Sequence, residues 1–326
     1  MAQEMRAVVV PKHGGVDVLE VQTRPRPEPG PGQLLVQVAA SGVNFIDVYQ
    51  REGVYDVPTP FVLGGESAGR VVAVGDGVSE FSVGDVVATA RGQGTHATYA
   101  LIPAEGAVPV PDGVAPELAA AVMLQGMTAH YLVNSTYAVQ PGESVLVHAA
   151  AGGMGQLLVQ MAKAKGAHVI ATVGSPAKVE VARKRGADEV IRYDETDDLA
   201  AAVRDLEPAG VHVAYDGVGK ATFEASLASL RRRGMLALFG ASSGRVPPFD
   251  LQRLNPAGSL FVTRPTLAHY TADRAELTWR AGDVLGAVAD GSLHVDIGGR
   301  YHLEDAAQAY VDLEGRRSIG KLLIVP

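Results

Sequence analysis

A glycine-rich stretch in the middle of the chain has the residue types and the spacing of a dinucleotide-binding turn. The apolar run Ser144–Ala149 leads into Ala150-x-Gly152-x-x-Gly155, and an amphipathic stretch follows. In a strand–turn–helix setting, Gly152 lets the backbone approach a pyrophosphate and Gly155 lets the helix pack close to the strand. The helix start then faces the anion with unpaired N–H groups. Although alanine replaces the first glycine of the pattern, we expect this turn to bind a dinucleotide.

The segment after the next predicted strand indicates which dinucleotide binds. NAD sites place an Asp or Glu about 20 residues beyond the turn, where it holds the ribose 2′-hydroxyl. Here the segment Val169–Ser175 contains no carboxylate. Ser175 and Pro176 are typical of a helix start, and Lys178 in the first turn opposes the helix dipole. A bound 2′-phosphate would reverse that penalty, so the sequence favours NADPH; the alternative is a solvated surface lysine.

The composition excludes several other chemistries. The chain has no cysteine, so disulfides and thiolate-ligated metal sites are impossible. Its nine histidines lack a metal-binding spacing, and we interpret His148 in the first strand as a core residue. The net charge of -8 argues against a general nucleic-acid binder. Because no apolar run reaches the roughly 18 residues of a membrane helix and no signal peptide is visible, we expect a cytoplasmic protein.

The glycine-rich turn needs a parallel sheet to position it. Strand-like runs occur at Ser144–Ala149, His168–Val173, Glu189–Tyr193, Val211–Tyr215, Met235–Phe239 and Ser259–Thr263. Helix-like stretches lie between most of them, at Gln156–Lys165, Ala177–Arg185, Asp197–Leu206 and Thr222–Leu230. This alternation predicts βαβ units and a complete doubly wound sheet.

The flanking segments predict a second domain. The first 110 or so residues hold short apolar runs separated by turn clusters, which favours β-structure. Leu118–Thr136 is predicted to be helical with a break near Gly126. The tail after Pro265 is too short for a domain alone, so we expect it to pack onto the first one. The predicted domains are 1–125, completed by 266–326, and 126–265.

Seven short motifs are spread along nearly the whole chain: Gly42-Val-Asn-Phe-Ile-Asp-Val-Tyr49, Leu63-Gly-Gly-Glu-Ser-Ala-Gly69, Gly126-Met-Thr-Ala129, Val147-His-Ala-Ala-Ala-Gly-Gly-Met-Gly155, Asp216-Gly-Val-Gly219, Phe239-Gly-Ala-Ser-Ser-Gly244 and Gly320-Lys321. In their order and spacing, they resemble the quinone oxidoreductase (zeta-crystallin-like) branch of the zinc-free medium-chain dehydrogenase/reductase superfamily. The resemblance implies an α/β fold with a GroES-like β-barrel catalytic domain plus a Rossmann doubly wound parallel-sheet domain. It also implies a cleft between the domains and usually a homodimer.

The resemblance also bears on zinc. Alcohol dehydrogenases of the superfamily hold catalytic zinc with a cysteine and a histidine, whose places are taken here by Asn44 and Gly65. Glu66 persists without its histidine neighbour, and the four-cysteine zinc lobe is absent. We therefore expect no bound metal and no Lewis acid to polarise an alcohol.

Carried over residue by residue, the resemblance implies a set of site residues. Asn44, Tyr49 and Thr128 would lie near the nicotinamide and the substrate; Ala151, Gly152, Gly153, Met154 and Gly155 at the pyrophosphate; Gly174, Ser175, Lys178 and Tyr193 around the 2′-phosphate; and Val218, Gly219, Phe239, Gly240, Ala241 and Ser242 along the path to the nicotinamide, with Lys321 nearby. The chain departs from its relatives at Gln125, where lysine is common, and at Ala241, where a close relative would have asparagine.

The expected activity is direct hydride transfer from NADPH to a quinone or a similar electron-poor acceptor. Most of the rate would come from positioning the donor and the acceptor in a dry cleft. One alternative is reduction of the double bond of an enone or enoyl thioester, with Tyr49 as the acid. Another is a non-enzymatic protein that senses NADPH or binds single-stranded nucleic acid.

Overall fold

The chain folds into two compact units. The computed structural model describes residues 3–316 and 318–326, so residues 1–2 and 317 of the first predicted domain lie outside the described part. One unit, the barrel unit, comprises the chain up to Met127 together with Thr271–Pro326, and the Rossmann unit comprises Thr128–Tyr270. The boundaries between the units therefore fall at 127/128 and 270/271.

The barrel unit is built from short strands whose apolar faces form its core. Its strands are β1 (Glu4–Val10), β2 (Glu20–Pro25), β3 (Gln33–Gly42), β4 (Phe61–Val62), β5 (Ser67–Val74), β6 (Val86–Thr89), β7 (Tyr99–Pro103), β8 (Ala107–Pro109), β15 (Ile297–Tyr301) and β16 (Lys321–Ile324). Its own helices are α1 (Phe45–Arg51), α8 (Arg274–Ala289) and α9 (Ala306–Glu314). A three-stranded sheet has the order β2-β1-β4; a larger one has the order β15-β16-β3-β5-β6-β8, with β7 also paired to β3.

The tail of the chain completes the barrel unit. β16 pairs antiparallel with β3, with Leu323 opposite Gly42 and Ile324 opposite Ser41. This pairing brings Lys321, the first residue of β16, to the end of β3 that leads into α1. The last strand is therefore part of the structure that positions α1.

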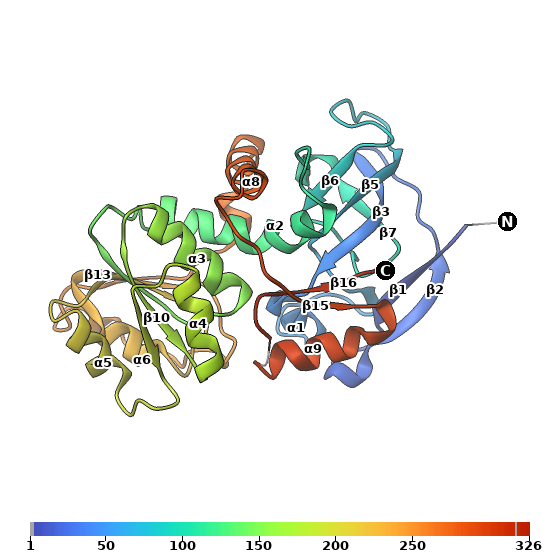
Figure 1. Ribbon diagram of the computed structural model, residues 1–326. Helices are drawn as coiled ribbons and strands as arrows, with labels where there is room; N and C mark the ends of the chain where they lie inside the picture. The colour runs from blue at the N-terminus through green and yellow to red at the C-terminus, as the bar shows by residue number, and fades with distance from the viewer. Residues whose placement is uncertain (1–2, 317) are drawn as a thin grey trace. The chain divides into compact units, whose positions relative to one another are not determined.

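The Rossmann unit contains a parallel sheet covered by helices. Its strands are β9 (Ser144–Val147), β10 (His168–Val173), β11 (Glu189–Arg192), β12 (Val211–Asp216), β13 (Leu230–Leu238) and β14 (Phe261–Thr263), in the order β11-β10-β9-β12-β13-β14. The helices are α3 (Gly153–Ala164), α4 (Pro176–Lys184), α5 (Leu199–Leu206), α6 (Phe223–Ala228) and α7 (Leu267–Tyr270). α3 and α4 lie on one side of this sheet and α5 and α6 on the other (Figure 1). The arrangement confirms the predicted doubly wound sheet.

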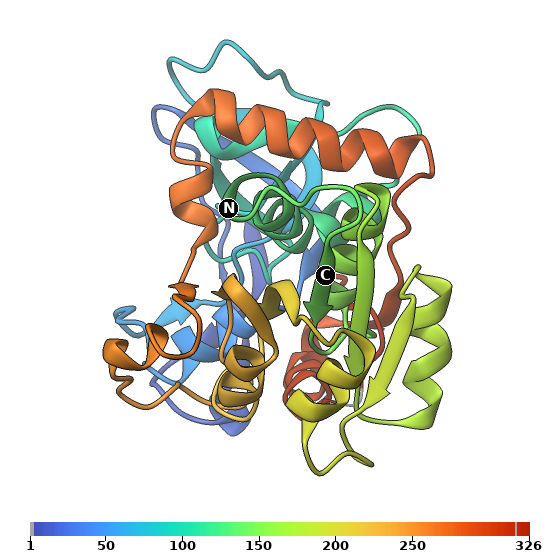
Figure 2. The same cartoon turned by 90° about the vertical axis from the view of Figure 1, so that its left-hand side faces the viewer.

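The predicted helix break near Gly126 is wrong. α2 (Pro116–Tyr131) is one α-helix that continues through Gly126, and a π-helical turn follows it at Leu132–Thr136. A Cβ atom at Gly126 would lie 2.6 Å from Cγ1 of Val284 in α8, the long orange helix of Figure 2. The glycine therefore permits close packing of α2 against α8 instead of ending the helix. In the described part of the chain, no helix is both long and apolar enough to span a bilayer.

Candidate active site

The turn between β9 and α3 uses its two glycines for different reasons. A Cβ atom at Gly155 would overlap the carbonyl oxygen of Ala149 and lie 2.6 Å from Cα of Ala150, so no larger residue fits against the strand. A Cβ atom at Gly152 would meet only the Ala149 carbonyl oxygen, at 3.3 Å. Gly152 is the N-cap of α3 and has an extended backbone, with φ -75° and ψ 166°. The space beside Gly152 therefore lies at a helix start, where N–H groups lack intrahelical partners.

Side chains behind the turn hold it in place. Gln156 Nε2 donates to the Ala151 carbonyl oxygen at 2.9 Å, and Gln156 Oε1 accepts from Arg185 Nε at 2.9 Å. Ala151, Gln156 and Arg185 are all buried. Gly153 and Met154 occupy the first turn of α3 and are half-buried. The turn is therefore braced from inside and presents its backbone outward, as an anion site at a helix start requires.

The four residues predicted around a 2′-phosphate lie at the carboxyl ends of β10 and β11. A Cβ atom at Gly174 would overlap the hydroxyl of Tyr193, so the ring lies directly against this glycine. Ser175 is the N-cap of α4, and its side chain makes no capping hydrogen bond. Lys178 is half-buried in the first turn of α4, which holds no acidic residue. The same short segment thus offers a cation in the first turn of α4, a tyrosine hydroxyl against Gly174 and a helix start, and this donor set fits a phosphate group.

One buried carboxylate organises the loops that follow β12 and β13. Asp216 Oδ1 accepts from the backbone N–H groups of Val218 and Gly219 at 2.8 and 2.9 Å, and Oδ2 accepts from the Thr222 and Ser226 hydroxyls, both at 2.7 Å. The second loop is tied to the first, since Ser242 N–H donates to the Gly217 carbonyl oxygen at 3.1 Å.

The same loops require glycine at their closest approach. A Cβ atom at Gly240 would lie 2.6 Å from the carbonyl oxygen of Gly217. Phe239, Ala241 and Ser242 of the second loop are half-buried, as is Val218 of the first, whereas Gly219 is buried. The six residues predicted to line the nicotinamide path therefore belong to one hydrogen-bonded double loop.

His148 is part of the core of the Rossmann unit. Its Nδ1 lies 3.0 Å from the Thr172 hydroxyl, and its Nε2 lies 2.9 Å from the Ser226 hydroxyl. Burial lowers the pKa of His148, and the nearby Asp216 carboxylate opposes the shift. The ring therefore has a partner at each nitrogen, which agrees with its interpretation as a core residue.

In the barrel unit, Asn44, Glu66 and Lys321 form a buried polar cluster. Asn44 Nδ2 donates to Glu66 Oε2 at 2.8 Å, and Lys321 Nζ donates to Asn44 Oδ1 at 2.6 Å and to Glu66 Oε2 at 2.7 Å. Asn44 is 3% exposed, Glu66 0% and Lys321 2%. A Cβ atom at Gly42 would overlap the Glu66 carboxylate, so the cluster also depends on that glycine.

A second buried network lies beside this cluster. Asp47 Oδ2 accepts from the Asn44 backbone N–H at 2.9 Å and from the Tyr310 hydroxyl at 2.9 Å. His96 Nε2 lies 2.7 Å from the Tyr310 hydroxyl, and His96 Nδ1 lies 2.7 Å from the Ser41 hydroxyl. The network connects the start of α1 to α9 and to the loop before β7.

The charges in this network respond strongly to burial. Burial raises the pKa of the Asp47 carboxyl to about 7, although the Asn44 N–H and the Tyr310 hydroxyl oppose the shift. Burial, together with the positive charge of Lys321, lowers the pKa of His96 to about 3. Burial and the adjacent Asp47 raise the pKa of Tyr310 well above its usual value. Between about pH 3 and pH 7, the folded site therefore favours a neutral Asp47 carboxyl and a neutral His96 imidazole.

Comparison with known proteins places this geometry in a family. A family model described as an alcohol dehydrogenase GroES-like domain matches residues 30–112, and one described as a zinc-binding dehydrogenase matches residues 153–275. A quinone oxidoreductase of Pseudomonas aeruginosa is 43% identical over 96% of this chain and 97% of the relative. Quinone oxidoreductase 1 of Escherichia coli is 41% identical over 97% of this chain and 98% of the relative.

The chain belongs to the quinone oxidoreductase branch of the medium-chain dehydrogenase/reductase superfamily. Among solved structures, an Escherichia coli quinone oxidoreductase complexed with NADPH superposes with a TM-score of 0.96 at 40% identity, covering 98% of this chain and 100% of that one. A mycobacterial protein complexed with NADPH gives a TM-score of 0.96 at 47% identity, with the same coverage. The predicted family and the predicted pair of GroES-like and Rossmann domains are confirmed.

The resemblance in sequence implied that Asn44 and Gly65 take the places of the two zinc ligands of alcohol dehydrogenases. In the structure, the Lys321 ammonium lies between Asn44 and Glu66. Among the residues that the structure describes, no group of three or more potential ligand side chains could hold a metal ion.

In this member of the quinone oxidoreductase family, the other two predicted catalytic residues, Tyr49 and Thr128, lie outside the buried cluster. Tyr49 is half-buried on α1, with its ring edge-on to that of Tyr55 at 5.8 Å. Thr128 is buried in α2 and belongs to the Rossmann unit. The structure thus brings Asn44 and Lys321 together, and it places Thr128 in the other unit.

Most of the polar network in the barrel unit was not predicted from the sequence. The resemblance gives Glu66 only as the remnant of a zinc motif, and no motif predicts a role for Asp47, His96 or Tyr310. A usable signal existed for Glu66 and Lys321, since each is the charged residue of an otherwise uncharged run, Leu63–Gly69 and Lys321–Pro326. Such charges are rarely buried without a partner.

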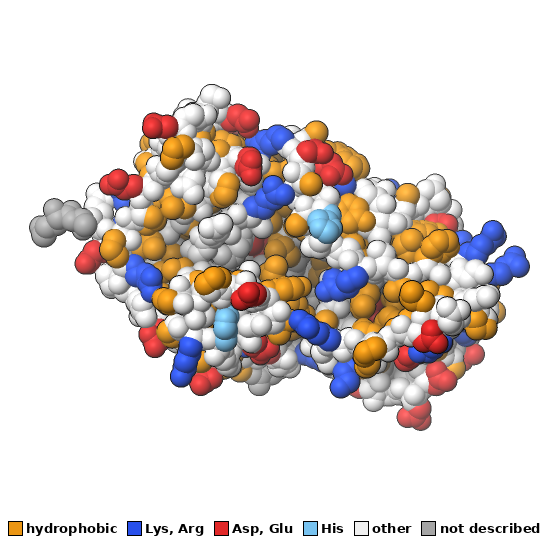
Figure 3. Space-filling view, turned by 180° about the vertical axis from the view of Figure 1, so that it is seen from behind, with side chains coloured by type: hydrophobic (Ala, Val, Ile, Leu, Met, Phe, Trp, Pro, Cys, Tyr) orange, Lys and Arg blue, Asp and Glu red, His pale blue; other side chains and the backbone are white. Residues whose placement is uncertain are grey.

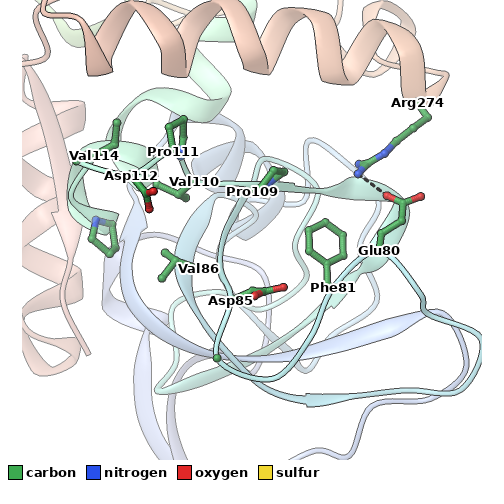
Figure 4. A pocket seen from close by; sticks show the side chains of 13 residues that line it. Glu80, Phe81, Asp85, Val86, Pro109, Val110, Pro111, Asp112, Val114 and Arg274 are labelled. Carbon is green, nitrogen blue, oxygen red and sulfur yellow. Dashed lines mark hydrogen bonds and ion pairs between the residues drawn. The ribbon is translucent and has the colours of Figure 1, made fainter.

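A separate cavity in the barrel unit lies among residues outside the predicted site. Its volume is about 620 Å³ (Figure 4), and its lining residues are Glu80, Phe81, Gly84, Asp85, Val86, Pro109, Val110, Pro111, Asp112, Gly113, Val114, Pro116 and Arg274. The guanidinium of Arg274 is held by Glu80 at 2.7 Å. None of the predicted site residues lines this cavity.

Proposed function

We propose that this chain is an NADPH-dependent oxidoreductase that reduces quinones or similar electron-poor acceptors by direct hydride transfer. The observation that carries the proposal is the start of α3, where Gly152 leaves space in front of free N–H groups and Gly155 fixes the helix against the strand. The relatives named quinone oxidoreductases, which match nearly the full length, support the acceptor class.

The Rossmann unit would bind the cofactor along the carboxyl ends of its strands. The pyrophosphate would lie against Ala151, Gly152, Gly153, Met154 and Gly155, where the helix dipole favours an anion. When bound, NADPH supplies the hydride. Ser175, Lys178 and Tyr193, beside Gly174, would hold the 2′-phosphate. The double loop with Val218, Gly219, Phe239, Gly240, Ala241 and Ser242 would set the path of the nicotinamide half.

The barrel unit would supply residues near the reacting atoms. Asn44 and Tyr49 lie at the start and in the middle of α1, and we propose that they face the acceptor together with Thr128. Reduction of a quinone needs no internal acid of matched pKa, because the product oxygen can take its proton from solvent. Positioning in a cleft that excludes water is then the main contribution of the protein.

Reduction of activated alkenes is the second candidate function. A 2-haloacrylate reductase of Burkholderia is 40% identical to this chain over 98% of both proteins, which makes an activated alkene a reasonable additional acceptor. Nucleic-acid binding has less support, because basic and acidic side chains are interspersed on the face seen in Figure 3 and the net charge is -8.

Steady-state oxidation of NADPH with a panel of acceptors tests the proposed function. The panel contains quinones, enones, an enoyl thioester and 2-haloacrylate, at equal concentration. We expect the highest kcat/KM with quinones. Turnover of alkenes alone would replace the first candidate with the second, and NADPH binding without turnover of any acceptor would refute both.

Lys178→Ala is expected to weaken NADPH binding by about tenfold or more, because it removes a charge-assisted contact to the 2′-phosphate. NADH lacks this phosphate, so its affinity should not change. Fluorescence titration with both cofactors measures the effect. Lys184→Ala, in the last turn of the same helix, is the matched control and should leave both affinities unchanged. Equal loss of NADPH and NADH affinity in Lys178→Ala would contradict this placement.

Metal independence is also proposed. With Asn44 and Gly65 at the two ligand places, we expect turnover to survive exhaustive chelation with EDTA, and elemental analysis to find no stoichiometric metal. Activity that is lost on chelation and restored by zinc would refute this expectation.

A cytoplasmic homodimer is the proposed state of the protein. β14 is the edge of the six-stranded sheet, and Phe261 on it is 56% exposed. An exposed edge strand with a large apolar side chain favours pairing with a second copy of the chain.

A further inference from the structure

The cluster of Asn44, Glu66 and Lys321 is a closed triangle of hydrogen bonds. Glu66 Oε2 accepts from both Asn44 Nδ2 and Lys321 Nζ, and Asn44 Oδ1 accepts from Lys321 Nζ. The second Glu66 oxygen, Oε1, accepts from the backbone N–H of Leu124 in α2 at 2.6 Å. Each corner of the triangle comes from a different part of the chain: the start of α1, the segment before β5 and the start of β16.

The triangle determines which way the Asn44 amide points. Its two N–H groups are both used, one by Glu66 Oε2 at 2.8 Å and one by the Gly42 carbonyl oxygen at 3.1 Å. Its oxygen faces the Lys321 ammonium, which can only donate. A flipped amide would place N–H groups against the ammonium and the amide oxygen against two acceptors. That orientation is excluded because all three contacts would be repulsive.

Lys321 and Glu66 are held in positions that fix the orientation of the Asn44 amide. Their side chains are almost fully buried, so neither charge is screened by water. Gly42 leaves no room for a side chain, since a Cβ atom there would also lie 2.9 Å from Lys321 Cε. The pairing of β16 with β3 fixes the lysine relative to Gly42.

We propose that Lys321 and Glu66 are positioning residues that hold Asn44 as a hydrogen-bond acceptor toward the bound molecule. This inference rests on the proposed function, which places Asn44 at the nicotinamide and the acceptor. Both donor positions of Asn44 are occupied within the barrel unit, so its amide oxygen, which also faces the backbone N–H of Asp47 in the capping box of α1, is the polar atom left to meet a hydroxyl of the ligand. Asn44 therefore accepts a hydrogen bond from a hydroxyl of the ligand and does not polarise a carbonyl oxygen by donating to it.

Two hydroxyl sources are compatible with this chemistry. One is a ribose hydroxyl of the dinucleotide, and the other is the hydroxyl of the reduced acceptor. If the dinucleotide supplies it, variants of the triangle weaken NADPH binding. If the acceptor supplies it, NADPH affinity stays constant and kcat/KM for the quinone falls.

The test combines Asn44→Ala with the paired variant Lys321→Met/Glu66→Gln. The paired variant removes both charges at once, so no unpaired charge is left in the core, and such replacements preserve folding in other proteins. A glutamine at position 66 can keep the Leu124 contact and donate to Asn44, which inverts the Asn44 amide. We expect the paired variant to lose about tenfold or more in NADPH affinity or in kcat/KM for the quinone, with a thermal midpoint close to that of the wild type.

The decisive comparison adds Asn44→Ala to the paired variant. Because the pair acts through Asn44, the triple variant should lose no more than Asn44→Ala alone. Losses that multiply would mean that the pair acts independently of Asn44, and a folded paired variant with wild-type NADPH affinity and kcat/KM would equally overturn the inference.

A matched control removes another buried cation with its carboxylate. Arg280 on α8 is paired with Glu276 at 3.0 Å and is also buried, so Arg280→Met/Glu276→Gln should change the thermal midpoint without changing either affinity or kcat/KM. If this control lost NADPH affinity or kcat/KM to the same extent, the losses in the paired variant would be explained by lowered stability, and the inference would be overturned. Failure of the wild type to bind NADPH would instead refute the proposed function before any variant is compared.

Discussion

Gly152→Val is expected to abolish NADPH binding while leaving the Rossmann unit folded. A Cβ atom at this position meets only the Ala149 carbonyl oxygen at 3.3 Å, and the backbone φ of -75° is open to any residue. The new side chain therefore enters the space that the pyrophosphate would fill, in front of the first N–H groups of α3. We expect the affinity to fall by about 100-fold or more as the contacts at the helix start are lost. The free energy of unfolding should fall only by the roughly 0.5–3 kcal/mol typical of point variants.

Gly155→Val provides the matched comparison one helical turn away. There a Cβ atom would overlap backbone atoms, with Cα of Ala150 at 2.6 Å, so the helix must move away from β9. We expect a large fall in the thermal midpoint of this variant. Scanning calorimetry and fluorescence titration on the same samples measure both quantities. A lowered midpoint with unchanged NADPH affinity in Gly152→Val would show that the pyrophosphate is placed wrongly.

The difference between these two glycines illustrates what the sequence could predict. Strand, turn and helix follow one another within a short stretch, and the roles of Gly152 and Gly155 depend on local geometry that the spacing encodes. The same holds for β10, which matches its prediction at both ends, and for α4, which follows the expected Ser175-Pro176 start. The ends of the other helices and strands differ by a few residues from those expected from the sequence, because a local pattern does not define the last hydrogen bond of an element.

Gly126 shows where local reasoning failed. Glycine lowers helix propensity, which favoured a break. The structure instead packs Val284 of α8 against this position, and the residues that make the contact are far apart in the chain. Tertiary packing thus decided the outcome, and no pattern around Gly126 contained that information.

The polar networks of the barrel unit were beyond prediction for the same reason. Lys321 and Glu66 are 255 residues apart, and His96 and Tyr310 are 214 apart. The family resemblance identified Asn44 and Lys321 separately, but only the antiparallel pairing of β16 with β3 makes them partners. The predicted cofactor residues of the Rossmann unit follow the strands in order, whereas the barrel unit combines residues from both ends of the chain.

Asp47→Asn and His96→Gln are expected to show opposite pH dependences of the free energy of unfolding. Burial raises the pKa of Asp47 from 3.8 to about 7, so its stabilising contribution is present below pH 3.8 and is lost as the pH rises toward 7. Burial lowers the pKa of His96 from 6.5 to about 3, so its contribution is present above pH 6.5 and is lost as the pH falls toward 3. Between pH 3.8 and 6.5, the folded chain holds the proton on Asp47 and the unfolded chain holds it on His96, and the two effects cancel.

Removing either partner should therefore expose the effect of the other. In Asp47→Asn, which resembles the neutral carboxyl, the free energy of unfolding should fall relative to the wild type by about 1.4 kcal/mol per pH unit as the pH is lowered from 6.5 toward 4. In His96→Gln, the difference from the wild type should have the opposite slope, because only the carboxyl then titrates and stability falls as the pH rises. Urea unfolding of the three proteins at half-unit pH intervals measures the slopes, and groups common to all three cancel in the differences. Parallel curves for the wild type and Asp47→Asn would mean that the Asp47 carboxylate is stabilised as an anion by its two hydrogen bonds. Parallel curves for the wild type and His96→Gln would mean that His96 stays accessible to protons in the folded chain.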